Sequence, residues 1–178
     1  EPPATTARPQ SRTEAGAERR QLTTMFCDMV DSTALSAQFD PEDVRDMIAS
    51  FRETCVRVVK HYEGFAARFV GDGILVYFGY PTAHEDDAER AVRAGLRVLE
   101  ATDELELEVR AAVNSGEAVV TLPARADHGE ALVAGDVVNT ASRLQSAAPP
   151  GALVVGELTF RTTRDRIAYE ELEPVSLK

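Results

Sequence analysis

Two aspartates stand where apolar runs of the sequence end, and their side chains are suited to binding a metal. Asp28 follows the β-rich run of residues 23–27, and Asp72 lies between Gly71 and Gly73 at the tip of a predicted hairpin. Hard divalent cations prefer oxygen ligands, and Mg²⁺ at nucleotide sites usually binds one or two carboxylates together with substrate phosphates. The pair therefore indicates a shared metal site, although either aspartate taken alone is more typical of a turn.

A second polar pair lies on a predicted helix. Asn139 and Arg143 are four residues apart in the helix expected over residues 137–147, so their side chains share one face. That face is suited to contacting a polar ligand, and it is equally typical of a solvent face with local hydrogen bonds. The acids at residues 85–87 are explained better by the start of a helix, where negative charge interacts favourably with the helix dipole.

Elements near the start of the domain must position the first aspartate. The first strand, which begins near Leu22, is apolar on both faces, and this predicts a place in the middle of a sheet. A helix is expected after Asp40, because Asp40 can cap its N-terminus and Pro41 suits its first position. Gly64 is the predicted stop of this helix.

The remaining pattern alternates strands and helices. Strands are expected over residues 65–70, 74–78, 105–113, 118–122, 152–155 and 167–177, and helices after residue 85, over 137–147 and over 157–162. Small polar residues 114–116 predict a turn between two of these strands, and residues 123–130 predict a surface loop. Hairpins and helices in this order predict an α+β fold, with helices packed on a mainly antiparallel sheet.

Composition and charge restrict the class of protein. With 178 residues, 44% of them hydrophobic, the chain fits one domain over residues 19–178, preceded by a flexible arm or linker at residues 1–18. The net charge of −11 argues against nucleic acid as a partner, because polyphosphate backbones are repelled. Two cysteines without CxxC spacing, no apolar run long enough to span a membrane and no signal-peptide core predict a cytoplasmic protein without direct membrane contact.

Five short motifs follow one another between residues 20 and 177. They are Phe26-Cys27-Asp28-Met29-Val30-Asp31-Ser32-Thr33, Phe69-Val70-Gly71-Asp72-Gly73, Ala83-His84-Glu85-Asp86-Asp87-Ala88-Glu89-Arg90-Ala91, Val109-Arg110 with Asn114-Ser115-Gly116-Glu117, and Gly135-Asp136-Val137-Val138-Asn139-Thr140-Ala141-Ser142-Arg143-Leu144. Each alone is weakly specific. Together, in this order, they resemble the catalytic domains of class III nucleotidyl cyclases, which make cyclic AMP or cyclic GMP from the nucleoside triphosphate. The residues within these motifs are most similar to those of bacterial domains from multidomain regulatory proteins.

The resemblance implies a ferredoxin-like fold that works as a homodimer with composite active sites at the interface. Asp28 and Asp72 match the two metal-binding aspartates of the family, and the Met29 carbonyl matches a backbone ligand. The metals are two divalent ions per site, Mg²⁺ or Mn²⁺. Asn139 matches the residue that orients the ribose, and Arg143 matches the one that stabilises charge on the α-phosphoryl group in the transition state.

Other matching positions imply contacts with the phosphates and the base. The segment Asp31-Ser32-Thr33 and Arg110 match phosphate-binding positions, although the family normally has glycine in place of Asp31. Arg68 and Leu132 match the base-selecting positions, where adenylyl cyclases usually have a lysine and often an aspartate or threonine. Guanylyl cyclases usually have glutamate and cysteine there, so the base preference stays open.

The sequence therefore predicts a nucleotidyl cyclase that prefers ATP over GTP and makes 3′,5′-cyclic AMP and pyrophosphate. Asp31, Arg68 and Leu132 leave two alternatives open. One is a pseudo-cyclase, a dimerising nucleotide-binding module with little or no turnover, and the other is guanylate or mixed specificity. A palm-type polymerase or dinucleotide synthase also uses two carboxylates and metals, but the helix that carries Asn139 and Arg143 argues against it.

Overall fold

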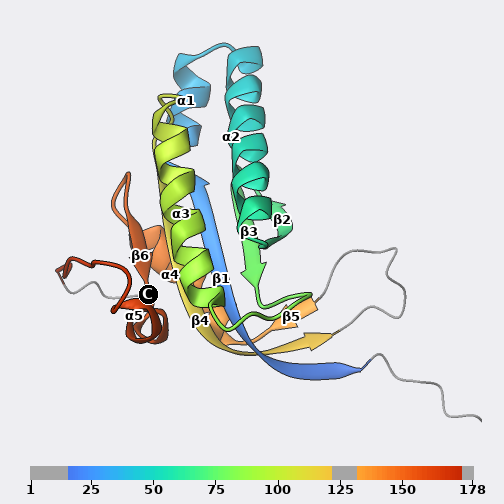
Figure 1. Ribbon diagram of the computed structural model, residues 1–178. Helices are drawn as coiled ribbons and strands as arrows, with labels where there is room; N and C mark the ends of the chain where they lie inside the picture. The colour runs from blue at the N-terminus through green and yellow to red at the C-terminus, as the bar shows by residue number, and fades with distance from the viewer. Residues whose placement is uncertain (1–15, 122–131, 174–178) are drawn as a thin grey trace, which may run out of the picture.

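The computed structural model describes residues 16–121 and 132–173, which form a six-stranded sheet covered by helices (Figure 1). Neighbouring strands hydrogen-bond in the order β2-β3-β1-β4-β5, all antiparallel, and β6 pairs with β4 in parallel. The strands are β1 (Ala17–Met29), β2 (Phe65–Val70), β3 (Gly73–Phe78), β4 (Val109–Thr121), β5 (Leu132–Ala134) and β6 (Leu153–Val155). The helices are α1 (Ser32–Gln38), α2 (Pro41–His61), α3 (Asp87–Asp103), α4 (Asp136–Ala147) and α5 (Glu157–Thr163). This arrangement confirms the predicted α+β class.

The two longest strands, β1 and β4, form the centre of the sheet. β1 lies between β3 and β4, as its two apolar faces predicted, and β4 pairs with it along its whole length. The prediction of two strands joined by a turn at residues 114–116 is therefore wrong. Asn114 donates to the Val137 carbonyl at 3.0 Å, and the Ser115 hydroxyl hydrogen-bonds the Thr23 hydroxyl at 2.8 Å. The small polar residues thus connect the middle of β4 to α4 and β1 by hydrogen bonds.

The sheet separates two layers of helices. Helices α2 and α3 lie side by side on one face, and α4 packs on the other (Figure 1). Cys27 and Met29 are buried in the core under α2 and α3, whereas Leu22 packs with Val137 of α4. Because side chains alternate along a strand, Asp28 shares the face of Leu22 and points towards the α4 layer.

Helix α2 begins and ends as predicted. The Asp40 side chain accepts a hydrogen bond from the Glu42 amide at 3.1 Å, as an N-cap does. At the other end, Glu63 has a left-handed backbone (φ 60°), and the Gly64 amide donates to the Val59 carbonyl at 2.9 Å, so Gly64 closes the end of the helix as predicted. Gly64 is also needed for packing, because a Cβ atom there would lie 2.7 Å from Cζ of Phe78.

Three further expectations change. The residues after Asp31 form an unpredicted helix, α1. Strand β1 begins at Ala17, inside the predicted arm. Residues 1–15 of that arm and the predicted loop at 123–130 lie outside the described part of the structure. The predicted strand over residues 167–177 is wrong for its described part. That segment packs by side chains, since the Tyr169 hydroxyl bonds the Thr163 hydroxyl at 2.7 Å. Among the described residues, no helix combines the length and apolar character needed to cross a membrane.

Candidate active site

Asp28 is the last residue but one of β1, and polar groups of two other elements reach its carboxylate. Nε2 of Gln145, on α4, donates to Oδ2 at 3.3 Å. The Arg110 guanidinium, at the paired position of β4, lies 3.8 Å from the same oxygen. The Asp28 side chain remains 26% exposed, so one side of the carboxylate is accessible to a ligand.

Asp72 reaches Asp28 because the turn between β2 and β3 contains two glycines. Gly71 has a left-handed backbone (φ 61°), which glycine adopts without strain. At Gly73, a Cβ atom would lie 2.8 Å from the Cys27 carbonyl oxygen and 3.2 Å from Oδ1 of Asp28. Only glycine therefore lets the turn close against the end of β1. The predicted hairpin is confirmed, and it brings the two predicted metal ligands together.

The two carboxylates repel each other in a partly buried place. Burial, followed by the neighbouring Asp72 carboxylate, raises the pKa of Asp28 to about 6, and Arg110 and Gln145 only partly oppose this rise. Oδ2 of Asp72 is buried and has no hydrogen-bond partner among the described residues. A buried oxygen without a partner is costly. A cation bound between the carboxylates would supply that partner and remove the repulsion.

The available donors fit a hard divalent ion. Carboxylate oxygens of Asp28 and Asp72 are ligands that Mg²⁺ and Mn²⁺ prefer. The Met29 side chain is buried in the core, so only its backbone carbonyl can serve as a ligand. Within residues 16–121 and 132–173, no group of three or more His, Cys, Asp or Glu side chains could hold a metal. Two carboxylates alone leave coordination positions that substrate phosphates and water would fill.

Helix α4 has two opposite faces. Val137, Ala141 and Gln145, at every fourth position, are buried. Asn139 and Arg143 are exposed and, as predicted, share the other face. One helix therefore touches Asp28 of its own chain with one face and presents the two predicted catalytic side chains outward with the other.

The predicted phosphate-binding residues lie near the end of β1. Asp31 precedes α1 with a left-handed backbone (φ 52°, ψ 30°) and makes no side-chain cap hydrogen bond, which explains why glycine suits this position. Ser32 and Thr33 begin α1, the first half-buried and the second exposed. Arg110 is engaged within the chain, since its Nη1 donates to the Ser146 carbonyl at 3.3 Å and its guanidinium faces Asp28.

The two predicted base-selecting residues come from different strands. Arg68 is exposed on β2, opposite Leu75 and beside a register shift that follows Ala66. Leu132 begins β5, where its backbone pairs with Thr121. The side chain of Leu132 is outside the described part of the structure, so the pair is placed by its strands alone.

Two residues of the site were missed by the sequence interpretation. Gln145 interrupts the buried stripe of α4, and a polar residue on an apolar stripe is a signal that could have revealed it. Arg52 of α2 donates to the Gly71 carbonyl at 2.7 Å, next to Asp72. Nothing in the local sequence marks Arg52, because its partner lies in another element.

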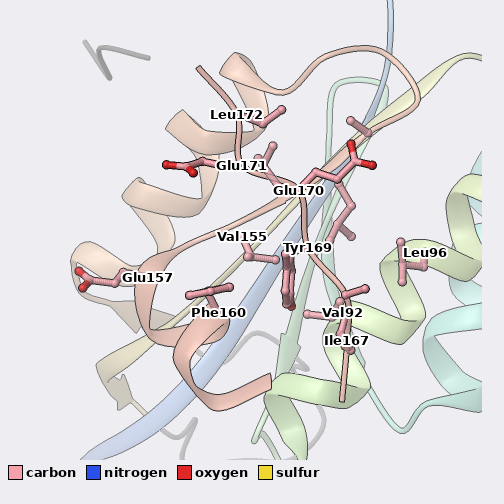
Figure 2. Close-up of a pocket in the computed structure, with 14 residues that line it drawn as sticks. Val92, Leu96, Val155, Glu157, Phe160, Ile167, Tyr169, Glu170, Glu171 and Leu172 are labelled. Atoms are coloured by element: carbon pink, nitrogen blue, oxygen red, sulfur yellow. The ribbon is translucent and has the colours of Figure 1, made fainter. Parts of the chain in front are cut away.

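A separate cavity of about 730 Å³ lies between α3, β6, α5 and the segment that follows α5 (Figure 2). Its apolar lining includes Val92, Val155, Phe160 and Tyr169, with Glu157, Glu170 and Glu171 also lining it. None of the predicted site residues lines it. Acidic side chains and an apolar wall are unsuited to a triphosphate, so the carboxylate pair is the better candidate site.

Comparison with known proteins identifies the family. Residues 16–178 match the model of the adenylate and guanylate cyclase catalytic domain. The chain therefore belongs to this family, and its fold is the α+β fold of class III nucleotidyl cyclase domains.

Several relatives are similar over most of this chain. Adenylate cyclase 1 of Rhizobium meliloti is 30% identical over 137 residues, which cover 71% of this chain and 21% of that protein. An uncharacterised protein of the same organism is 29% identical over 159 residues, which cover 85% of this chain and 16% of that protein. The chain thus spans about a fifth or less of these two curated relatives.

Solved structures of both cyclase types are also similar. The guanylyl cyclase Cya2 is 30% identical, with a TM-score of 0.81 over 92% of this chain and 89% of that one. The adenylyl cyclase CyaB of P. aeruginosa is 27% identical, with a TM-score of 0.80 over 86% of this chain and 85% of that one. Because the two have different substrates by name, the comparison leaves the base preference undecided.

Proposed function

We propose that this chain is a catalytically active nucleotidyl cyclase domain that converts ATP to 3′,5′-cyclic AMP and pyrophosphate. The observation that carries the proposal is the carboxylate pair Asp28 and Asp72, which the chain brings together although the two groups repel. Such an arrangement is costly without a bound cation, and the buried, unpartnered Oδ2 of Asp72 fits the same explanation.

In the proposed reaction, an in-line displacement at the α-phosphorus, the residues of this chain have different roles. Asp28, Asp72 and the Met29 carbonyl would hold the ions at the end of β1. Bound Mg²⁺ or Mn²⁺ would lower the pKa of the ribose 3′-hydroxyl and neutralise charge on the leaving pyrophosphate. Asn139 orients the ribose, and Arg143 donates to oxygens of the α-phosphoryl group. The 3′-hydroxyl loses its proton to water, its oxygen bonds to the α-phosphorus, and the bond from the α-phosphorus to the oxygen shared with the β-phosphate breaks, so that pyrophosphate leaves.

The exposed face of α4 supports a composite site in a homodimer. Asn139 and Arg143 point away from the sheet, whereas Gln145 on the opposite face contacts Asp28 of the same chain. In our proposal the aspartates of one protomer therefore work with Asn139 and Arg143 of the partner. Arg110, close to Asp28, adds positive charge where the triphosphate would lie. Sedimentation of the purified chain should reveal a dimer.

ATP is the preferred substrate in this proposal. Arg68 is exposed and can donate to a purine ring nitrogen, and this position is a glutamate in typical guanylyl cyclases. Leu132 cannot accept a hydrogen bond from the adenine amino group, so discrimination against GTP should be incomplete.

A pseudo-cyclase is the second candidate, and Asp31 is the observation that favours it. The left-handed conformation at this position favours glycine, and an aspartate places an extra negative charge near the phosphate-binding segment. Such a domain would bind a nucleotide without turning it over.

One assay separates these candidates. The purified chain is incubated with ATP or GTP and Mn²⁺ or Mg²⁺, and cyclic products are measured by chromatography, with Asp72→Ala as the matched inactive control. We expect cyclic AMP to exceed cyclic GMP. Binding of Mn²⁺ and nucleotide in a thermal-shift assay without any cyclic product would favour the pseudo-cyclase.

A further inference from the structure

The turn that carries Asp72 packs against β1 at Gly73 but is open at Gly71. Gly71 adopts a left-handed backbone, and apart from its chain neighbours no atom lies within 4 Å of the position that a Cβ atom would occupy there. Glycine also has the largest choice of backbone conformations. A metal ligand on such a turn needs an outside restraint, because metal sites tolerate little displacement of their ligands.

Arg52 of α2 supplies contacts to both sides of this turn. Its Nη2 donates to the Gly71 carbonyl oxygen at 2.7 Å. Its guanidinium carbon also lies 4.7 Å from the centre of the Phe69 ring on β2, a distance suited to a cation–π contact. The Arg52 side chain thus joins the helix to the last part of β2 and to the peptide unit that precedes Asp72.

We propose that Arg52 is a positioning residue that holds Asp72 in place for metal binding. The peptide unit between Gly71 and Asp72 is planar, so fixing its carbonyl oxygen also fixes its N–H group and the direction in which Asp72 begins. The inference rests on the proposed function, because the ligand role of Asp72 belongs to that proposal. Arg52 itself touches neither substrate nor metal.

Arginine is suited to this role in a way that lysine is not. Its flat guanidinium group stacks on an aromatic ring while its N–H groups donate in fixed directions. A lysine would keep the positive charge but would lose the stacking surface and the rigid geometry. The proposal therefore predicts a graded effect, with Arg52→Lys between wild type and Arg52→Met.

The test measures metal binding rather than turnover. Mn²⁺ binding is followed by electron paramagnetic resonance in the presence of a non-reactive ATP analogue with a methylene bridge between the α- and β-phosphates. Arg52→Met should weaken binding by about tenfold, the lower end of the effect of losing a group that supports a metal ligand. Amide hydrogen exchange at residues 69–73 of the metal-free protein should become faster in the same variant.

Arg45→Met is the matched control. Arg45 lies on the same helix, its side chain is 73% exposed, and it pairs with Asp46 on that helix. We expect this variant to bind Mn²⁺ and exchange amides as wild type does. If Arg52→Met only lowers the melting temperature and leaves both readouts unchanged, Arg52 is structural and the proposal is overturned. If wild type binds no Mn²⁺ and nucleotide, the proposed function fails, while the exchange data still decide whether Arg52 restrains the turn.

Discussion

The two parts of the candidate site differ in how complete they are within one chain. The metal-binding part is assembled internally, since β1 carries Asp28 and the glycine turn places Asp72 beside it. The α4 part is exposed, and Asn139 and Arg143 face away from the sheet. Gln145 joins the two parts from the buried side of the helix.

This difference shows that the aspartate pair restricts the residues around it, whereas the outward face of α4 does not. The two carboxylates repel each other, yet they are kept together by a turn in which Gly73 has no room for a Cβ atom and Gly71 has a left-handed backbone. This arrangement is unfavourable unless a bound cation offsets the repulsion. The outward face of α4 costs the isolated chain nothing, because its polar groups are solvated. In our proposal the active unit uses a second surface opposite α4, and a second copy of the chain is the simplest source of that surface.

The largest expected effect comes from removing either part completely. Asp28→Ala, Asp72→Ala and Arg143→Ala should each lower the cyclase rate by about 100-fold or more, because each removes charge stabilisation at both sites of a homodimer. Initial rates with Mn²⁺ and ATP measure this loss. Melting curves serve as the folding control, and Asp28→Ala should melt no lower than wild type without metal at pH 7.5. Full activity in any of the three would reject the assignment.

Mixing two inactive variants sharpens the comparison between the two parts. A mixed dimer of Asp72→Ala and Arg143→Ala chains has one site with intact aspartates and an intact arginine, while its other site carries both defects. With free exchange, about half of the dimers are mixed, so roughly a quarter of wild-type activity should return.

The readout is the rate of the mixture against each pure variant, with chain exchange verified by pull-down of a tagged chain. No recovery despite exchange would mean that each site is built from one chain or that the domain does not turn over nucleotide.

Local signals in the sequence predicted several of the backbone elements that position the candidate site. The hairpin around Asp72 and the N-cap at Asp40 depend on a few neighbouring residues, and both are present. The shared face of Asn139 and Arg143 follows from helical periodicity alone. The metal site at Asp28 and Asp72 was inferred from residue chemistry and then from the family resemblance, whereas the catalytic roles of Asn139 and Arg143 came from the resemblance alone. All of these roles stay predictions.

Long-range contacts account for what the sequence did not reveal. Residues 114–116 have the composition of a turn, but Asn114 and Ser115 bond groups far away in sequence, which keeps β4 continuous. Gln145 and Asp28 are 117 positions apart, and no local pattern connects them. Arg52 is 19 positions from Gly71 and contacts it only because α2 packs next to β2.

Acidic pH should weaken the metal-binding part. Asp28 holds its proton up to about pH 6 in the folded chain, against an ordinary pKa of 3.8. An incoming ion must displace that proton, so Mn²⁺ affinity with a non-reactive nucleotide should fall about tenfold per pH unit below 6.

The same shift makes the metal-free free energy of unfolding decline as the pH rises from 3.8 to about 6, since the folded state binds the proton more tightly. Mn²⁺ titrations between pH 5 and 8 measure the change in affinity, and denaturant melts across the interval from pH 3.8 to about 6 measure the change in stability. Asp28→Asn should flatten the stability profile in that interval, and an unchanged profile would show that Asp28 does not titrate there.

The smallest expected effect concerns Asp31, which lies between β1 and α1. A unit charge about 4 Å from another is worth about 1 kcal/mol in water, so removing the carboxylate should raise turnover by roughly fivefold if it repels the phosphates. Asp31→Gly also relieves the left-handed backbone, whereas Asp31→Asn removes only the charge and tolerates that conformation. Equal gains in kcat for both variants would assign the effect to charge, and a gain in Asp31→Gly alone would assign it to crowding. A lower rate in both would mean that Asp31 contributes an oxygen to the metal site, and the carboxylate pair would then be a group of three.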